Sequence, residues 1–187
     1  MKDVVYKTIS NYEQLSTCYH EAGHIVYALL SNCRVEKAHL VSEIEAYVYY
    51  DVPEFWNTKN IQKKMSLLKK EIGIRYSGIL AEKIFYENLH GNVNIPNFIK
   101  IGSSSDFKSV TDILTKHNIK KPGLERKKFK NKIKTKVIRQ LRHNWNSIAL
   151  VANLLLKDKY IDYNKIKKVL IKDSKRWSQI FKKIENC

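Results

Sequence analysis

Two histidines and a glutamate stand close together near the start of the chain, in the run His20-Glu21-Ala22-Gly23-His24. If this run is helical, His20 and His24 leave the same face of the helix, one turn apart. Two imidazole nitrogens at that spacing can bind one zinc ion at about 2.0–2.1 Å each. The motif therefore predicts a zinc site, with one Zn²⁺ per chain.

The glutamate of the motif supplies the second half of a hydrolytic site. Glu21 can act as general base on a metal-activated water and then pass the proton to the leaving nitrogen of a peptide. The small residues Ala22 and Gly23 allow another element to approach the helix closely. The alternative is a helix with two exposed histidines and a solvated glutamate. The motif also needs a third protein ligand, and the chemistry does not choose among the many carboxylates.

The elements that would position these residues follow from the pattern around them. Apolar or small residues recur near a 3.6-residue period over Asn11–Ser31, which predicts a helix. Arg34–Val52 is rich in β-branched and aromatic residues and predicts two strands. Ser42–Glu45 is the expected hairpin connection, and Pro53 ends the second strand. The motif helix is thus expected to lead into a small β-element.

The remaining chain is predicted to be mostly helical. The expected elements are one long helix or two abutting helices over Thr58–Glu87, a loop over Asn88–Gly102, a helix from the Ser103–Asp106 caps to about Lys116, a helix from about Leu124 to Lys157 in one piece or more, and terminal helices over Ile161–Lys172 and Ser174–Ile184. The fold class is therefore mainly α (α+β). We expect a single domain over 1–187, with a metal-site core at about 12–117 and a C-terminal helical part at about 123–187.

Composition favours a folded, cytoplasmic protein. The hydrophobic fraction is 43%, and no stretch approaches the about 18 apolar residues of a membrane helix. No signal peptide is recognisable, and three cysteines without metal-like spacing fit a reducing compartment. The net charge of +17 favours acidic partners, nucleic acid or anionic membranes. Solvated lysine-rich helix faces explain the charge equally well, including that of the basic segment Lys120–Arg142.

Four segments together resemble the peptidase domain of the FtsH family of ATP-dependent zinc metalloproteases, in order and approximate spacing over about residues 12–117. They are Tyr19–Leu29 around the motif, Val35–Glu54, Tyr76–Phe85 and Gly102–Thr111. The chain departs from the family at Ser77-Gly78-Ile79, where the family has Gly-Gly-Arg, and at Val110, where it has alanine. The resemblance implies a stand-alone zinc-peptidase domain.

The resemblance also implies the remaining site residues. Asp106 occupies the position of the family's third zinc ligand, although a plain helix N-cap is its other role. Glu82 is expected to orient a ligating histidine, and it is the competing candidate for direct ligand. An exposed edge strand could pair with an extended substrate backbone, through Ala46, Tyr47, Val48 and Tyr49. The alternative for this strand is a purely structural role.

The expected function is a zinc metalloendopeptidase, a hydrolase that cuts flexible or unfolded protein segments. No phosphate-binding Gly-x-x-x-x-Gly-Lys-Ser/Thr motif occurs, so we expect no intrinsic ATPase and allow for a separate ATPase or adaptor as partner. Family members work as hexamers, which leaves an oligomer open. Two alternatives remain: a non-catalytic zinc-containing binding or regulatory module, and a basic nucleic-acid-binding protein, although no nucleic-acid motif supports the latter.

Overall fold

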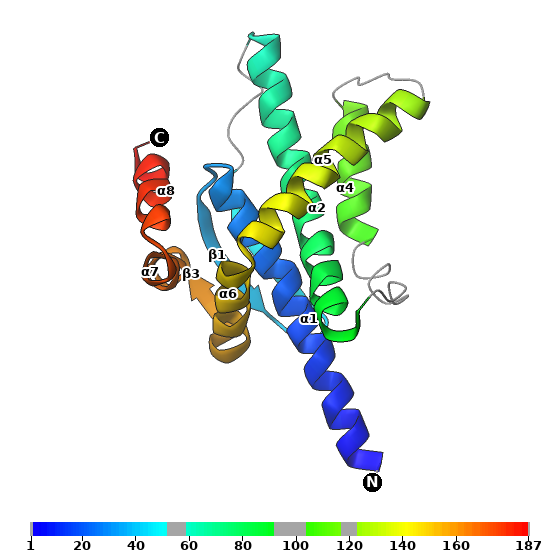
Figure 1. The fold of residues 1–187 in the computed structure, drawn as a ribbon, viewed down its shortest axis with the longest axis vertical. Coiled ribbons are helices and arrows are strands. Elements are labelled where there is room, and N and C mark those ends of the chain that lie inside the picture. Colours follow the sequence, from blue (N-terminus) through cyan, green and yellow to red (C-terminus); the bar gives the residue numbers. More distant parts are fainter. Residues whose placement is uncertain (1, 52–58, 92–103, 117–122, 187) are drawn as a thin grey trace.

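A computed structural model of the chain describes residues 2–51, 59–91, 104–116 and 123–186. Within these ranges the fold is mainly helical with one three-stranded antiparallel sheet, so the predicted α+β class is confirmed (Figure 1). The elements are α1 (Lys2–Leu30), β1 (Val35–Leu40), β2 (Ala46–Tyr50), α2 (Ile61–His90), α4 (Ser104–Lys116), α5 (Gly123–His143), α6 (Trp145–Asp158), β3 (Tyr160–Asp162), α7 (Tyr163–Asp173) and α8 (Lys175–Glu185).

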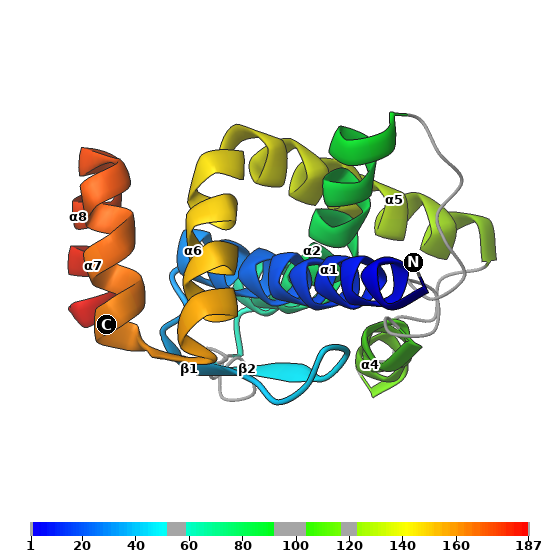
Figure 2. The same cartoon turned by 90° about the horizontal axis from the view of Figure 1, so that it is seen from below.

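Helix α1 carries the motif and runs through the middle of the molecule. Its neighbours are α2, α5, α6 and the sheet, with the sheet and α5 on opposite sides (Figure 2). The helix begins at Lys2, earlier than the predicted Asn11, and the added residues contain neither Gly nor Pro. Its buried face includes Ile25 and Leu29, which are fully inaccessible to solvent. The core therefore surrounds the helix that presents the two histidines.

A close crossing between α1 and α2 brings the two site helices together. A side-chain carbon added at Gly23 would lie 2.6 Å from the Ala81 Cβ and 2.6 Å from the Ser77 carbonyl oxygen. Only a residue without Cβ fits this crossing, which agrees with the prediction that the small residues of the motif admit a neighbouring element. Helix α2 is one continuous helix, capped by the Asn60 side chain, which accepts from the Lys63 N–H at 2.9 Å.

The predicted hairpin is present, and a third strand joins it. β1 and β2 pair antiparallel from Leu40↔Ala46, and the Val41 N–H donates to the Glu45 carbonyl at 2.8 Å in the connection. β3 pairs with the other side of β1, which gives the order β2-β1-β3. The prediction missed β3 because three residues between two helices carry no periodic signal. β2 is left as an edge of the sheet.

The region predicted to be helical from about Leu124 to Lys157, with one unbroken helix as an option, consists of two helices, because α5 ends at His143 and α6 begins at Trp145. Asn144 interrupts the helix: its side-chain Nδ2 donates to the Gln140 carbonyl at 2.7 Å and so competes with the backbone. Helix α6 packs against α1 and α7, and α8 follows α7 at the end of the chain (Figure 1).

The basic segment is amphipathic in the structure. Ile133, Val137 and Leu141 are buried, while most of its lysines and arginines face solvent.

Some predicted features lie outside the described residues, namely Pro53, Ser103 and most of the predicted loop Asn88–Gly102. Helix α2 extends three residues into that loop. Among the described residues, no helix is long and apolar enough to cross a membrane.

Candidate metal centre

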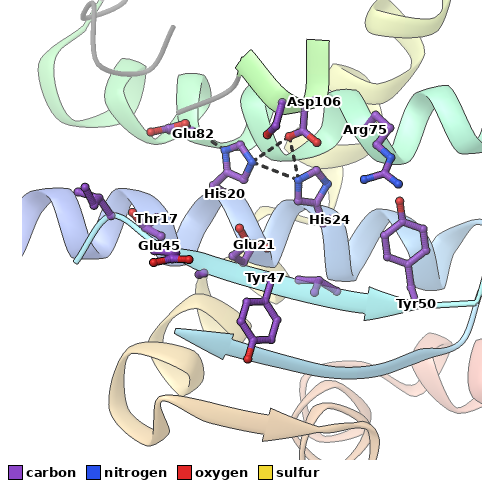
Figure 3. Close-up of a pocket in the computed structure, with 14 residues that line it drawn as sticks. Thr17, His20, Glu21, His24, Glu45, Tyr47, Tyr50, Arg75, Glu82 and Asp106 are labelled. Atoms are coloured by element: carbon purple, nitrogen blue, oxygen red, sulfur yellow. Dashed lines mark hydrogen bonds and ion pairs between the residues drawn. The ribbon is translucent and has the colours of Figure 1, made fainter. Parts of the chain in front are cut away.

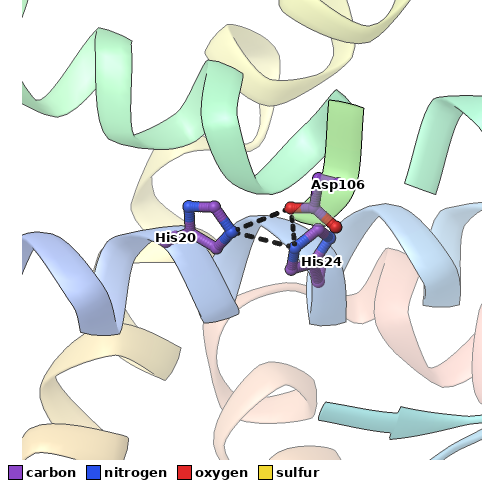
Figure 4. Close-up of side chains that lie close together, drawn as sticks. All are labelled: His20, His24 and Asp106. Atoms are coloured by element: carbon purple, nitrogen blue, oxygen red, sulfur yellow. Dashed lines mark hydrogen bonds and ion pairs between the residues drawn. The ribbon is translucent and has the colours of Figure 1, made fainter. Parts of the chain in front are cut away.

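Three predicted ligands from two helices meet at one point. The His20 and His24 Nε2 atoms of α1 lie 3.1 Å apart, and Asp106 Oδ2 of α4 lies 3.1 Å from the first and 3.2 Å from the second (Figure 4). Two donors bound to one ion at about 2.0–2.1 Å with tetrahedral angles would lie about 3.3 Å apart. The observed triangle has nearly these dimensions, so the group can hold a metal ion.

Contacts behind the histidines determine which nitrogen is free. His24 Nδ1 lies 2.7 Å from the Ile74 carbonyl, which can only accept, so Nδ1 carries the hydrogen. His20 Nδ1 lies 3.1 Å from the Glu82 carboxylate, which likewise accepts. Glu82 is itself held by the Ser16 hydroxyl, which donates to its other oxygen at 2.6 Å. In the neutral imidazoles, both Nε2 atoms are therefore lone-pair acceptors that face Asp106.

This arrangement fits a cation better than any hydrogen-bonded alternative with neutral rings. Two Nε2 lone pairs and a carboxylate oxygen are all acceptors, so none of them can donate to another. The three groups come together only if a proton or a metal ion lies among them. A His₂Asp set of this kind suits zinc and other first-row transition metals, with further coordination positions left to water or substrate.

Helix α2 leaves room for the metal centre through a glycine. A Cβ at Gly78 would lie 2.5 Å from His20 Nε2 and would also clash with His24 Nε2. A glycine in the interior of a helix costs about 1 kcal/mol relative to alanine, so its presence there needs a structural reason. Here the reason is the space beside the two ligand atoms. In the sequence, Gly78 stands out only as part of a departure from the FtsH-family pattern, and its position within a helical pattern was the available signal.

Glu21 and Glu82 also reach the cavity that contains the triad (Figure 3). Glu21 is 7% exposed, and burial raises the pKa of its carboxyl, against the opposing effect of His20 and His24. A carboxyl group with a raised pKa is a stronger base once ionised, as proton transfer from water requires.

The pKa values of two of the ligand residues are also shifted. Burial lowers the pKa of His20, but the hydrogen bonds to Asp106 and Glu82 have a larger combined effect and raise it to about 10. Burial also opposes ionisation of Asp106, yet His24 and His20 lower its pKa overall.

The edge strand β2 borders the same cavity. Ala46, Tyr47 and Val48 line it, whereas Tyr49 is not among the lining residues. Among the strands that the structure describes, only β1 pairs with it, which leaves its other edge available for backbone pairing. The proposed role of this strand in substrate binding stays a prediction.

The cavity holds two further polar residues that the sequence analysis did not single out, Arg75 on α2 and Tyr50 at the end of β2. Neither belongs to a spacing pattern with the motif, and they come together because α2 and β2 both pack against α1. A lone arginine within a helix carries no signal that would have identified it.

Comparison with known proteins adds no family assignment. The chain matches no model of a known protein family, and no curated protein is significantly similar to it in sequence.

Proposed function

We propose that the chain is a zinc-dependent endopeptidase whose metal ligands are His20, His24 and Asp106. The observation that carries the proposal is the triangle of acceptor atoms at 3.1–3.2 Å with Glu21 in the same cavity. The resemblance of four segments to the FtsH-family peptidase domain supports the same reading. Zinc held there would polarise the substrate carbonyl and acidify a water molecule.

Each protein group has a definite task in peptide hydrolysis. Glu21 removes a proton from the attacking water and delivers it to the leaving amide nitrogen, so one carboxylate serves as base and then as acid. Glu82 and the Ile74 carbonyl hold the imidazole rings in orientation through Nδ1. The free edge of β2 would align the substrate as an added strand, which favours extended, unfolded segments.

The general base distinguishes hydrolysis from oxidation. Two histidines and one carboxylate are also the ligand set of non-haem iron(II) oxygenases. Oxygen activation at such a site does not require a protein base next to the first ligand, whereas hydrolysis does. The buried Glu21 directly follows His20 and lines the cavity, which favours hydrolytic chemistry.

Cleavage of casein and of a peptide library by wild-type protein and by Glu21→Gln tests the proposal. We expect the wild type to cleave and the variant to lose activity by about 10²-fold or more, because it loses the proton-transfer step. Zinc content should be equal in the two proteins. Glu13→Gln, two turns earlier on α1 and outside the residues that line this cavity, serves as the charge-matched control and should retain full activity.

Two outcomes contradict the proposal. Equal cleavage by wild type and Glu21→Gln would remove the assigned base. Zinc binding without any cleavage, by wild type on unfolded proteins, would instead support a non-catalytic zinc module.

A further inference from the structure

One end of the cavity is basic, and the hydrolytic chemistry does not use it. The Arg75 guanidinium carbon lies 5.7 Å from the centre of the Tyr50 ring. Both side chains stand on the His24 side of the triad, whereas Glu82, Thr17 and Glu45 lie on the His20 side (Figure 3). Arg75 is the one Lys or Arg among the described residues that line this cavity. The cavity therefore has an acidic end and a basic end.

Polar atoms at the basic end are buried without hydrogen-bond partners. These atoms are the Tyr50 hydroxyl oxygen and Arg75 Nε, and the neighbouring Glu71 Oε2 is likewise buried without a partner. Among the described residues, no carboxylate lies within ion-pair distance of Arg75, and Glu71, one turn earlier on α2, does not pair with it. Buried donors without partners are uncommon in folded proteins, and a ligand that accepts from them removes the cost.

The chemistry of the two groups suits one kind of ligand. A guanidinium presents a planar fork of donors that matches a carboxylate. Burial raises the pKa of Tyr50 to about 12, against the effect of Arg75, so its hydroxyl keeps its hydrogen and can donate near neutral pH. An anion elsewhere in the cavity would meet Glu21, Glu45 and Glu82, which repel it.

We propose that Arg75 and Tyr50 form a subsite for a substrate carboxylate, so that the enzyme selects peptides with an Asp or Glu side chain or a C-terminal carboxylate near the cleaved bond. This inference rests on the proposed peptidase function for its substrate class. The net charge of +17 acts in the same direction, because it attracts acidic peptides to the protein.

Binding measured without turnover tests the subsite. Zinc-loaded Glu21→Gln protein is titrated with fluorescent hexapeptides of Ala and Gln that carry one Glu at each position in turn, each as the C-terminal acid and as the amide. We expect at least one carboxylate-bearing peptide to bind about 10- to 100-fold more tightly than the neutral amide, as a charged hydrogen bond would provide. The acid and amide series separate a C-terminal carboxylate from a side-chain carboxylate.

Substitutions then locate the preference. Arg75→Gln should abolish the preference for carboxylate peptides. Tyr50→Phe should reduce the preference while keeping the aromatic ring, so it provides a second test if Arg75→Gln folds poorly. Arg142→Gln is the matched control, because Arg142 is an exposed arginine on α5 that pairs with Glu87 outside this cavity. It should keep the full preference.

Catalysis provides the second readout. In protein with Glu21 intact, Arg75→Gln should raise KM for the preferred peptide, so that kcat/KM falls more for that peptide than for the neutral amide. An equal loss on both peptides would overturn the subsite, because Arg75 would then serve the reacting carbonyl or the fold. Cleavage by wild type with no charge preference overturns the subsite and leaves the peptidase function standing. Arg75-dependent binding of carboxylate peptides without any cleavage would support the subsite and contradict the peptidase function.

Discussion

Each histidine of the triad has its Nδ1 occupied by a neighbour, and for His20 that neighbour is Glu82. Because Glu82 holds the ring with Nε2 toward Asp106, Glu82→Ala should raise the zinc dissociation constant by about 10- to 100-fold. Competition with a chelating dye measures this constant. Glu87→Ala, on the same helix but paired with Lys83 and Arg142 at the surface, is the control and should not change it.

Gly78 gives a test of the space beside the ligands. Gly78→Ala should abolish zinc binding, because the new methyl group would overlap both Nε2 atoms. The substitution should not lower helix content, since alanine favours the helix by about 1 kcal/mol. Zinc content and circular dichroism report the two effects. Gly123→Ala, where nothing lies within 4 Å of the added carbon, should leave zinc bound; normal zinc in Gly78→Ala would contradict the packing of α2 on the site.

The two buried cysteines, Cys18 and Cys33, should be inert. Burial raises the pKa of Cys18 to about 12 and that of Cys33 to about 11, with smaller opposing contributions from Lys159 and Lys70. Both groups therefore remain thiols at pH 8, and thiols react with iodoacetamide far more slowly than thiolates. Mass spectrometry after native labelling should find both peptides unmodified, and labelling in urea should modify both. Fast native labelling of Cys18 would show that this face of α1 opens.

Among the elements, α4 brings the third ligand to the site. It packs on α2 through Val110 and Leu114, both 1% exposed, and carries Asp106 in its first turn. Leu114→Ala would remove about 2–5 kcal/mol of packing, so α4 should dock less often and zinc should bind more weakly. Exposed Thr111→Ala on the same helix should have no such effect. Unchanged zinc affinity in Leu114→Ala would mean that Asp106 reaches the metal without α4 packing.

The elements differed in how well their sequence predicted them. The motif helix and the hairpin have strong local periodicity, and both were found where expected apart from their ends. The α5–α6 break depends on one asparagine side chain, and β3 depends on pairing with a strand more than a hundred residues away, so neither has a local signal.

The site residues also differ in whether a local sequence pattern identifies them. His20, Glu21 and His24 follow from helical spacing alone, whereas Asp106 is 86 residues from His20 and was found through the family resemblance. The roles of Gly78, Arg75 and Tyr50 become visible only once α2 and β2 are packed against α1.

For the whole molecule, metal and protons should compete at the triad. In the metal-free protein the pKa of His20 is raised from 6.5 to about 10, so its hydrogen bonds stabilise the fold fully below pH 6.5 and progressively less as pH rises toward 10. Zinc needs the neutral ring, so its stabilising effect should grow as pH rises from about 6 to 8. Urea unfolding should therefore show stability that falls with pH above 6.5 without zinc and stays nearly level with saturating zinc, because neither the zinc-bound nor the unfolded state holds the His20 proton there. Parallel slopes would contradict the shared site.

The most direct test is the zinc content of protein purified without chelators, measured by mass spectrometry for wild type, His20→Ala, His24→Ala and Asp106→Ala. Asp112→Ala is the control, because Asp112 is exposed on the same helix α4. We expect about one zinc per chain in wild type and control, and less than about a tenth of that in each ligand variant. Full zinc occupancy in Asp106→Ala, or no metal in the wild type, would contradict the metal centre.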